Sequence, residues 1–193
     1  MGKAFGYLIL FETGYSLLAI GLARTGGLNY LAMLFVPRVL SYAVVGLALS
    51  ALTQHQHPEA LDYKAQEGLF KRRPLVTGGI LIGTFSLLGL PLLPLFPHKQ
   101  MLWLLTARLD PHLLGWVLAG SLGLLINAAR LMRVFSLEKP DAVESLPVRE
   151  KTGFVILMAA LFLLMLTMGL STQILVPRFL EILSPFSQLV PMP

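Results

Sequence analysis

Lys99 lies in an apolar stretch of the chain, directly after a run of prolines. Pro91, Pro94 and Pro97 are spaced three residues apart and are followed at once by His98 and Lys99. Because proline lacks the backbone N–H that a helix needs, the span that contains it is predicted to be broken. An ammonium group at the centre of a transmembrane helix costs about 2.5 to 3.5 kcal/mol on insertion scales. A lysine at such a break therefore indicates a functional site, because irregular backbone within a membrane survives only where protein or a wet cavity surrounds it.

The chemistry that these residue types suggest is proton transfer. A buried lysine can load and release a proton, and a histidine such as His98 titrates near neutral pH without help. The alternative is that Lys99 and His98 mark the membrane edge, with the lysine reaching out to water. Both interpretations are open at this point.

Two further ionisable residues fall within apolar spans and should face the interior of a helix bundle. Glu12 could exchange a proton, or it could serve only to neutralise Arg38 or Lys99. Arg38 almost never loses its proton, so a fixed charge that influences its neighbours is the better role for it than direct proton transfer. Pro37 frees a carbonyl one turn earlier, which the guanidinium of Arg38 could bind.

Composition sets the class of protein. Of 193 residues, 55% are hydrophobic and 13% are charged, and the mean hydropathy is +0.74, which is typical of a polytopic membrane protein. The chain has no cysteine, so disulfides, thiolate metal sites and iron–sulfur ligation are excluded and any electron chemistry belongs to another subunit. His55 and His57 lie in a polar stretch of the sequence, which favours a solvated loop over a metal site. No nucleotide-binding loop, serine elbow or paired metal-ligand motif is present, so we expect no cofactor.

The hydropathy pattern predicts an all-α fold, a polytopic transmembrane helix bundle of about five spans with one discontinuous, proline-broken helix. The expected spans are about 4–23, 28–52, 74–107, 111–135 and 152–176. The third should break after Gly89 and resume as a helix at about His98, and a long polar loop is expected from Thr53 to Arg73. Pro74 should begin the third span, where its missing N–H costs nothing. Gly78, Gly79, Gly83 and Gly89 indicate close helix packing. We expect residues 1–176 to form the bundle and residues 177–193 to lie at the membrane interface.

The basic residues are distributed unevenly, which predicts the orientation. The net charge of +5 fits an acidic lipid surface rather than nucleic acid, since the basic residues lie in loops between apolar spans. If the broken span crosses the membrane once, one side holds ten of the basic residues: Lys3, Lys64, Lys71, Arg72, Arg73, Arg130, Arg133, Lys139, Arg149 and Lys151. The positive-inside rule then places the N-terminus and both long loops in the cytoplasm.

Three stretches together resemble a known family. Gly68–Pro74, Ser86–Pro91 and Phe96–Lys99 are similar to the antiporter-like proton-pumping subunits of respiratory complex I and the related Mrp antiporters, and closest to the N-type subunit. That family has a discontinuous helix that reads Ser-Leu-x-Gly-Ile-Pro-Pro and then Gly-Phe-x-x-Lys, and its lysine belongs to the proton pathway. Upstream, Glu12 falls where a histidine is common, and Arg38 falls where several members have a lysine.

The chain also departs from the family pattern. Leu92 replaces the second proline and Leu95 replaces the glycine before the phenylalanine, while Pro94 and Pro97 are added. Members of the family run to more than twice this length and contain two inverted repeats. This chain resembles the second repeat alone.

The resemblance implies a transport subunit that does no redox chemistry of its own. It would supply half of a proton channel in the inner membrane as part of an NADH/quinone oxidoreductase-type complex, with Lys99, Glu12, Arg38 and His98 in the proton pathway. The implied partners are lipid and the other membrane-arm subunits, including a chain that supplies the missing first repeat. The alternatives are a structural subunit that conducts nothing and an Mrp-type cation/proton antiporter subunit.

Overall fold

A computed structural model describes residues 2–53, 66–137 and 150–171 of the chain. Within these residues the fold is entirely helical, as the hydropathy pattern predicts. The helices are α1 (Gly2–Gly21), the short 3₁₀ turn η1 (Ala23–Thr25), α2 (Gly27–Thr53), α3 (Leu69–Arg72), α4 (Pro74–Leu88), α5 (Phe96–Leu109), α6 (Pro111–Ser136) and α7 (Thr152–Leu170). His55, His57 and the expected interfacial segment 177–193 lie outside the described residues.

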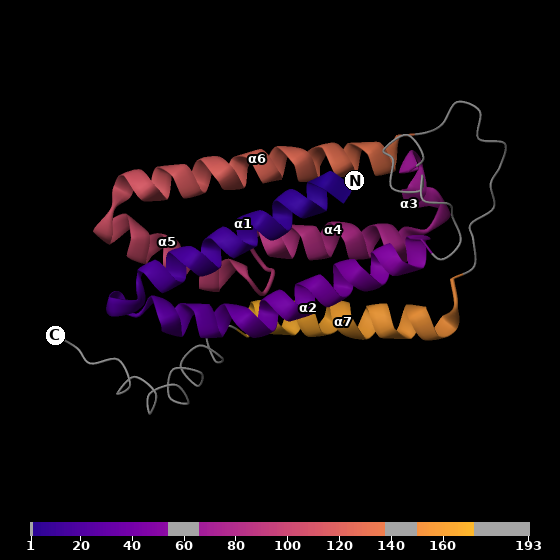
Figure 1. Cartoon of the computed structure of the whole chain (residues 1–193). Helices are drawn as coiled ribbons and strands as arrows, with labels where there is room; N and C mark the ends of the chain where they lie inside the picture. The colour runs from indigo at the N-terminus through magenta and orange to yellow at the C-terminus, as the bar shows by residue number, and fades with distance from the viewer. Residues whose placement is uncertain (1, 54–65, 138–149, 172–193) are drawn as a thin grey trace.

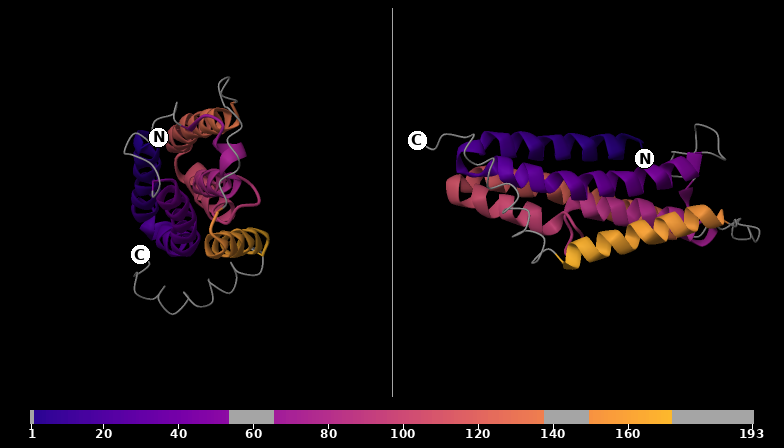
Figure 2. Two further views of the ribbon diagram at one scale, coloured as in Figure 1. Left: turned by 90° about the vertical axis from the view of Figure 1, so that its right-hand side faces the viewer. Right: turned by 90° about the horizontal axis from the view of Figure 1, so that it is seen from below.

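Four of the helices, α1, α2, α6 and α7, are long and apolar enough to cross a membrane. The remaining span is assembled from two shorter helices. α4 has 15 residues and α5 has 14, and they follow one another along the bundle with the proline-rich break between them (Figure 1). A second view shows the same order along the bundle (Figure 2). The broken span therefore crosses once, and the chain is a multi-pass helical membrane protein with about five spans.

The single crossing brings several helix ends together. The end of α2, the start of α4, the end of α6 and the start of α7 lie at one end of the bundle, and α1 begins toward the same end (Figure 1). The turn between α1 and α2 lies at the other end, where Gly26 adopts a left-handed backbone with φ of +93°. The helix ends that the predicted uneven distribution of basic residues places on one side of the membrane therefore lie together. That this end faces the cytoplasm stays a prediction.

Close packing between α2 and α4 forms the centre of the bundle, because these two helices share the most extensive interface. Glycines on α4 allow the approach: a Cβ atom on Gly79 would lie 2.9 Å from the Cβ of Ala48, and one on Gly83 would lie 3.1 Å from the carbonyl oxygen of Ser41. The prediction of close helix packing is confirmed for Gly79 and Gly83, whereas Gly78 makes only ordinary contact with Phe162 and Gly89 ends the helix. Small residues let two backbones approach within a membrane, where dispersion contacts replace the hydrophobic effect.

The break begins where α4 ends at Leu88. Gly89 has φ of +78° and closes the helix, with its N–H donating to the carbonyl of Ser86. Such a left-handed residue commonly ends a helix, and glycine adopts it without a steric penalty. Irregular backbone continues to Leu95, and α7 packs against it, since a Cβ atom on Gly169 would collide with the carbonyl oxygen of Leu92. The cover is partial, because the side chain of Leu92 is 65% exposed.

Two sequence-based boundaries are wrong. The helix after the break begins at Phe96 rather than His98, and Pro97 lies in its first turn, where a proline costs no hydrogen bond. Leu69–Arg72 is helical, although this stretch was expected to be loop. The last span is described as α7 up to Leu170, and residues 172–176 of the expected span lie outside the described part of the chain.

We expect Gly89→Ala to destabilise the bundle. A left-handed backbone costs an alanine about 1 to 2 kcal/mol, and the added Cβ would lie 2.8 Å from Cδ of Lys99. Thermal unfolding in detergent should show a lower midpoint. Gly46→Ala is the matched control, because that glycine is helical and has nothing within 4 Å of the new Cβ, so it should lose no stability. Equal losses in the two variants would contradict this account of the break.

Candidate functional site

Lys99 is completely buried, with 0% of its surface exposed. Its Nζ donates one hydrogen bond to Oε1 of Glu12 at 2.5 Å and another to the carbonyl oxygen of Leu87. The lysine is thus held between α1, the end of α4 and the start of α5. The alternative in which it reaches out to water at the membrane edge is wrong, because the side chain is enclosed and its charge is paired inside the bundle.

The carbonyl of Leu87, which accepts from Lys99, has no helical donor because of the sequence at the break. In a helix the carbonyl of Leu87 would accept from the N–H of the residue four positions later. That residue is Pro91, which has no N–H. The first proline of the run therefore leaves an acceptor free near Lys99, and a free carbonyl buried in a membrane needs a donor.

Glu12 connects the two cations of the site. Its Oε1 accepts from Lys99, and its Oε2 lies 2.8 Å from Nε of Arg38 in an ion pair. Glu12 is 2% exposed, and its carboxylate is shared by helices α2 and α5. Glu12, Arg38 and Lys99, which come from three separate spans, therefore form one charged cluster, called the triad below.

Arg38 completes the triad from α2. Its Nη1 donates to Oγ of Ser16 at 2.6 Å, one helical turn after Glu12 on α1. The prediction that Arg38 binds the carbonyl freed by Pro37 is wrong: its recorded partners are Glu12 and Ser16. A buried carboxylate is the stronger partner, because hydrogen bonds and contacts between ionised groups are roughly twice as strong as neutral ones.

Two aromatic rings on α1 enclose the lysine. Nζ of Lys99 lies 4.4 Å from the ring centroid of Tyr15 and 5.5 Å from that of Phe11, within the range of cation–π attraction. The indole N–H of Trp103 donates to the hydroxyl of Tyr15 at 2.5 Å, which fixes the orientation of that ring. Phe11 and Tyr15 are four residues apart and so lie on one face of α1, beside the face that carries Glu12.

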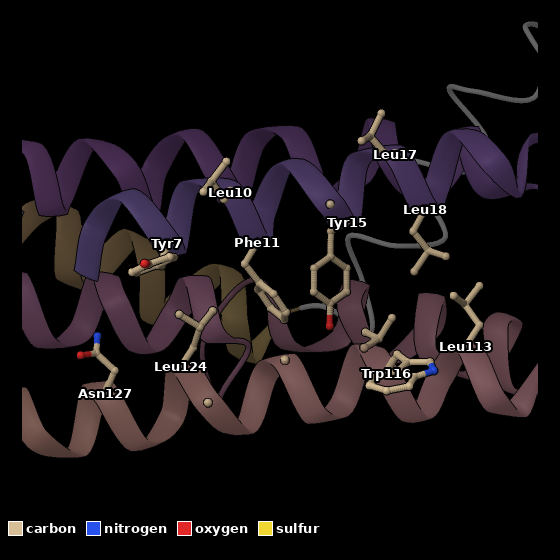
Figure 3. Close-up of a pocket in the computed structure, with 14 residues that line it drawn as sticks. Tyr7, Leu10, Phe11, Tyr15, Leu17, Leu18, Leu113, Trp116, Leu124 and Asn127 are labelled. Atoms are coloured by element: carbon tan, nitrogen blue, oxygen red, sulfur yellow. The ribbon is translucent and has the colours of Figure 1, made fainter. Parts of the chain in front are cut away.

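The same two rings form the wall of a groove between α1 and α6. The groove has a volume of about 900 Å³ and is lined almost entirely by apolar side chains. Figure 3 shows Phe11 and Tyr15 pointing from α1 toward α6, with Asn127 at one end of the groove and Trp116 at the other. The rings thus separate this open apolar surface from Lys99.

A pair of serines lies between α2 and α4. The hydroxyls of Ser41 and Ser86 are 2.7 Å apart, both are fully buried, and Ser41 also donates to the carbonyl of Pro37. The sequence indicated Ser86 only as the first residue of a motif, and it gave no sign that Ser86 would pair with Ser41. Ser86 is one residue before Leu87, and Ser41 is one turn after Pro37, so the pair joins the two helices beside the triad.

His98 is not part of the triad. It is partly buried, and its Nδ1 has no hydrogen-bond partner in the described parts of the chain. Adjacent residues on a helix point about 100° apart, so a neighbour in sequence need not share a site. Within the described residues, no group of three metal-ligating side chains comes together.

No protein-family model matches this chain. NADH-quinone oxidoreductase subunit N of Anaeromyxobacter sp. (strain Fw109-5) is 26% identical to it over 180 residues, an alignment that covers 87% of this chain and 34% of that protein. The chain thus spans about a third of the length of the curated relative it matches. The resemblance that the sequence motifs indicated is confirmed by a relative of that type.

We expect Glu12→Gln to be the most destabilising substitution in the triad. It removes the one carboxylate that Lys99 and Arg38 share, and breaking a buried ion pair from one side costs about 3 to 5 kcal/mol. The measurement is thermal unfolding in detergent, with Thr13→Val as a control at an exposed neighbouring position.

A double variant separates the charge effect from general damage. Glu12→Gln combined with Lys99→Met removes the uncompensated ammonium, so it should be more stable than Glu12→Gln alone. If the double variant is less stable than the single one, the lysine does not depend on the carboxylate for its burial.

Proposed function

We propose that this chain is a membrane-arm subunit of an NADH-quinone oxidoreductase-type complex, and that it moves protons through Lys99. The similarity to subunit N supports the type of complex. The observation that carries the proton-transfer role is the fully buried ammonium of Lys99, held at a helix break by both a carboxylate and a backbone carbonyl. A lysine with no conducting role would not need this arrangement, since methionine or leucine would occupy the position at lower cost.

The geometry supports a direct proton exchange between Lys99 and Glu12. Their Nζ and Oε1 atoms are 2.5 Å apart, so a proton can pass between them without movement of the backbone. When Lys99 releases a proton to the exit side, its neutral amine keeps two N–H groups but no longer balances the charge of the Glu12 carboxylate, which favours its reloading. Arg38 keeps a permanent positive charge beside the other oxygen of Glu12, which stabilises the ionised carboxylate, so a proton passed to Glu12 returns readily to Lys99.

The other residues have supporting roles in this proposal. Phe11 and Tyr15 stabilise the ammonium form through their ring faces and keep lipid away from it. His98 and water complete the route on the side of α5, through the Nδ1 atom that has no partner in the described chain. The electron chemistry belongs to other subunits.

The proposal includes the assembly and the orientation. Residues 1–176 act as the second repeat of an antiporter-like subunit, and another chain or segment supplies the first repeat. The complex lies in the inner membrane with the N-terminus and the long loops in the cytoplasm, in accordance with the positive charge of those segments. Residues 177–193 lie along the membrane interface.

We expect Lys99→Met to abolish most of the proton transport that depends on this subunit. Methionine fills a similar volume but carries no proton. Lys99→Arg should also be inactive, because arginine keeps the charge but does not release its proton. Lys151→Ala is the control, as an exposed lysine at a helix end. The measurement is NADH-driven proton uptake by membrane vesicles, divided by the rate of NADH oxidation, with complex assembly checked by gel electrophoresis.

The same experiment tests the structural alternative. Normal assembly with an unchanged proton-to-NADH ratio in both Lys99 variants would show that the subunit is a scaffold. It would overturn the proton-transfer role even if the chain is part of the complex.

A further inference from the structure

A hollow of about 420 Å³ lies on the surface between α1 and α2, beside the triad. It is lined by Ile9, Glu12, Thr13, Ser16, Arg38 and Tyr42. Its surface is mostly apolar, like that of the groove between α1 and α6, but both charged groups Glu12 and Arg38 contribute to its lining. Exposure rises across the triad toward this hollow, from 0% at Lys99 and 2% at Glu12 to 15% at Arg38. The triad is therefore closed at Lys99 and open at Arg38.

The charges of the triad are unbalanced. Lys99 and Arg38 are two cations that share one carboxylate, and no further ion pair to either cation is present in the described residues. In addition, Nε and Nη2 of Arg38 are buried and have no hydrogen-bond partner there, and the same holds for Oε2 of Glu12, which lies 2.8 Å from Nε in the ion pair. A guanidinium has five N–H donors, and leaving Nη2 buried without an acceptor is costly. With Lys99 protonated, the site thus lacks one negative charge and an acceptor for Nη2 of Arg38.

The depth of Arg38 restricts what can supply that charge. Arg38 lies eleven residues after the start of α2 at Gly27 and fifteen before its end at Thr53, so it is about 16 Å from one end and 22 Å from the other. The hydrocarbon core is about 30 Å thick, which places Arg38 near its middle. Lipid phosphate groups lie outside this core. A negative group at this depth is therefore one that a transmembrane helix carries.

The neighbouring surface is suited to helix packing. Ile9 is 53% exposed at the hollow, and Phe35 and Val39, on either side of Arg38 in sequence, are 65% and 51% exposed. Polar atoms at the centre of an apolar face are the arrangement by which transmembrane helices bind one another with specificity.

We propose that the hollow between α1 and α2 is the docking surface for a transmembrane helix of a partner subunit, which carries a carboxylate side chain at mid-membrane depth that pairs with Arg38. The partner's carboxylate accepts from Nη2 and balances the second cation of the triad. This inference rests on the proposed function for the existence of a membrane partner, but the charge and depth arguments come from the triad itself.

The test uses the full chain in phosphatidylcholine vesicles and two synthetic peptides as probes. Each peptide is a leucine-rich transmembrane helix of about 20 residues, and the two differ only in a central glutamate or glutamine. Because the chain has no cysteine, Thr53→Cys provides one labelling site for energy transfer to a labelled peptide. The glutamate peptide should bind about 5- to 30-fold more tightly than the glutamine peptide, the range for strong polar contacts between membrane helices.

Variants assign the preference to Arg38. Arg38→Gln should remove it, Arg38→Lys should keep part of it, and Arg133→Gln should leave it unchanged, since Arg133 is an exposed arginine near the end of α6. Equal binding of the two peptides by the unmodified chain would overturn the inference without reference to any variant. A preference that survives in Arg38→Gln would overturn it as well.

The lipid alternative and the proposed function are separated by two further results. If phosphatidylglycerol in the vesicles abolishes the preference for the glutamate peptide, Arg38 binds a lipid phosphate and the inference is wrong. If the peptides bind equally while proton transport still depends on Lys99, the docking surface is refuted and the proposed function stands. If the preference is present but proton transport is independent of Lys99, the docking surface stands and the proton-transfer role is refuted.

Discussion

The ion pair between Lys99 and Glu12 is the interaction on which the arrangement of the bundle depends. A fully buried ammonium in a membrane is stable only when its charge and its N–H donors are satisfied by protein. Glu12 supplies the charge and Leu87 supplies a carbonyl, so α1, the end of α4 and the start of α5 must meet at one point. The position of α1 in the bundle is therefore determined largely by a polar requirement, since its buried surface is small in comparison with that of α2.

The proline run creates part of this site as well as interrupting the helix. Pro91 leaves the carbonyl of Leu87 without its helical donor, and Gly89 turns the chain so that Lys99 packs against its backbone. Pro97 then starts the next helix without loss of a hydrogen bond. Pro91 frees the acceptor, Gly89 makes room for Lys99, and Pro97 lies in the first turn of the helix that carries the Lys99 donor.

The fold was predictable from the sequence because about 20 consecutive apolar residues have few alternatives to a membrane span. The triad was predictable for a related reason: Glu12, Arg38 and Lys99 are rare residue types in such spans, so each one indicates a partner. The enclosing residues were not predictable. Tyr15, Trp103, Ser41 and Ser86 are common in apolar helices, and only the packing shows that they meet. The position of His98 outside the triad was not predictable, because adjacent residues on a helix point about 100° apart. The roles assigned to these residues in proton transfer remain proposals.

The groups on the two sides of Lys99 differ in how they respond to a change of charge at the surface of the bundle. Toward α6 it faces the rings of Phe11 and Tyr15, which stabilise a cation but accept no proton and carry no net charge. Toward α2 it faces Glu12 and then Arg38, through which a change of charge at the surface of the bundle is felt at Nζ in a medium of low dielectric constant. The direction from Lys99 to Arg38 runs across the helices rather than along them. In the proposed function, a change of charge on a neighbouring subunit would therefore reach Lys99 across the helices, through the same carboxylate that exchanges a proton with it.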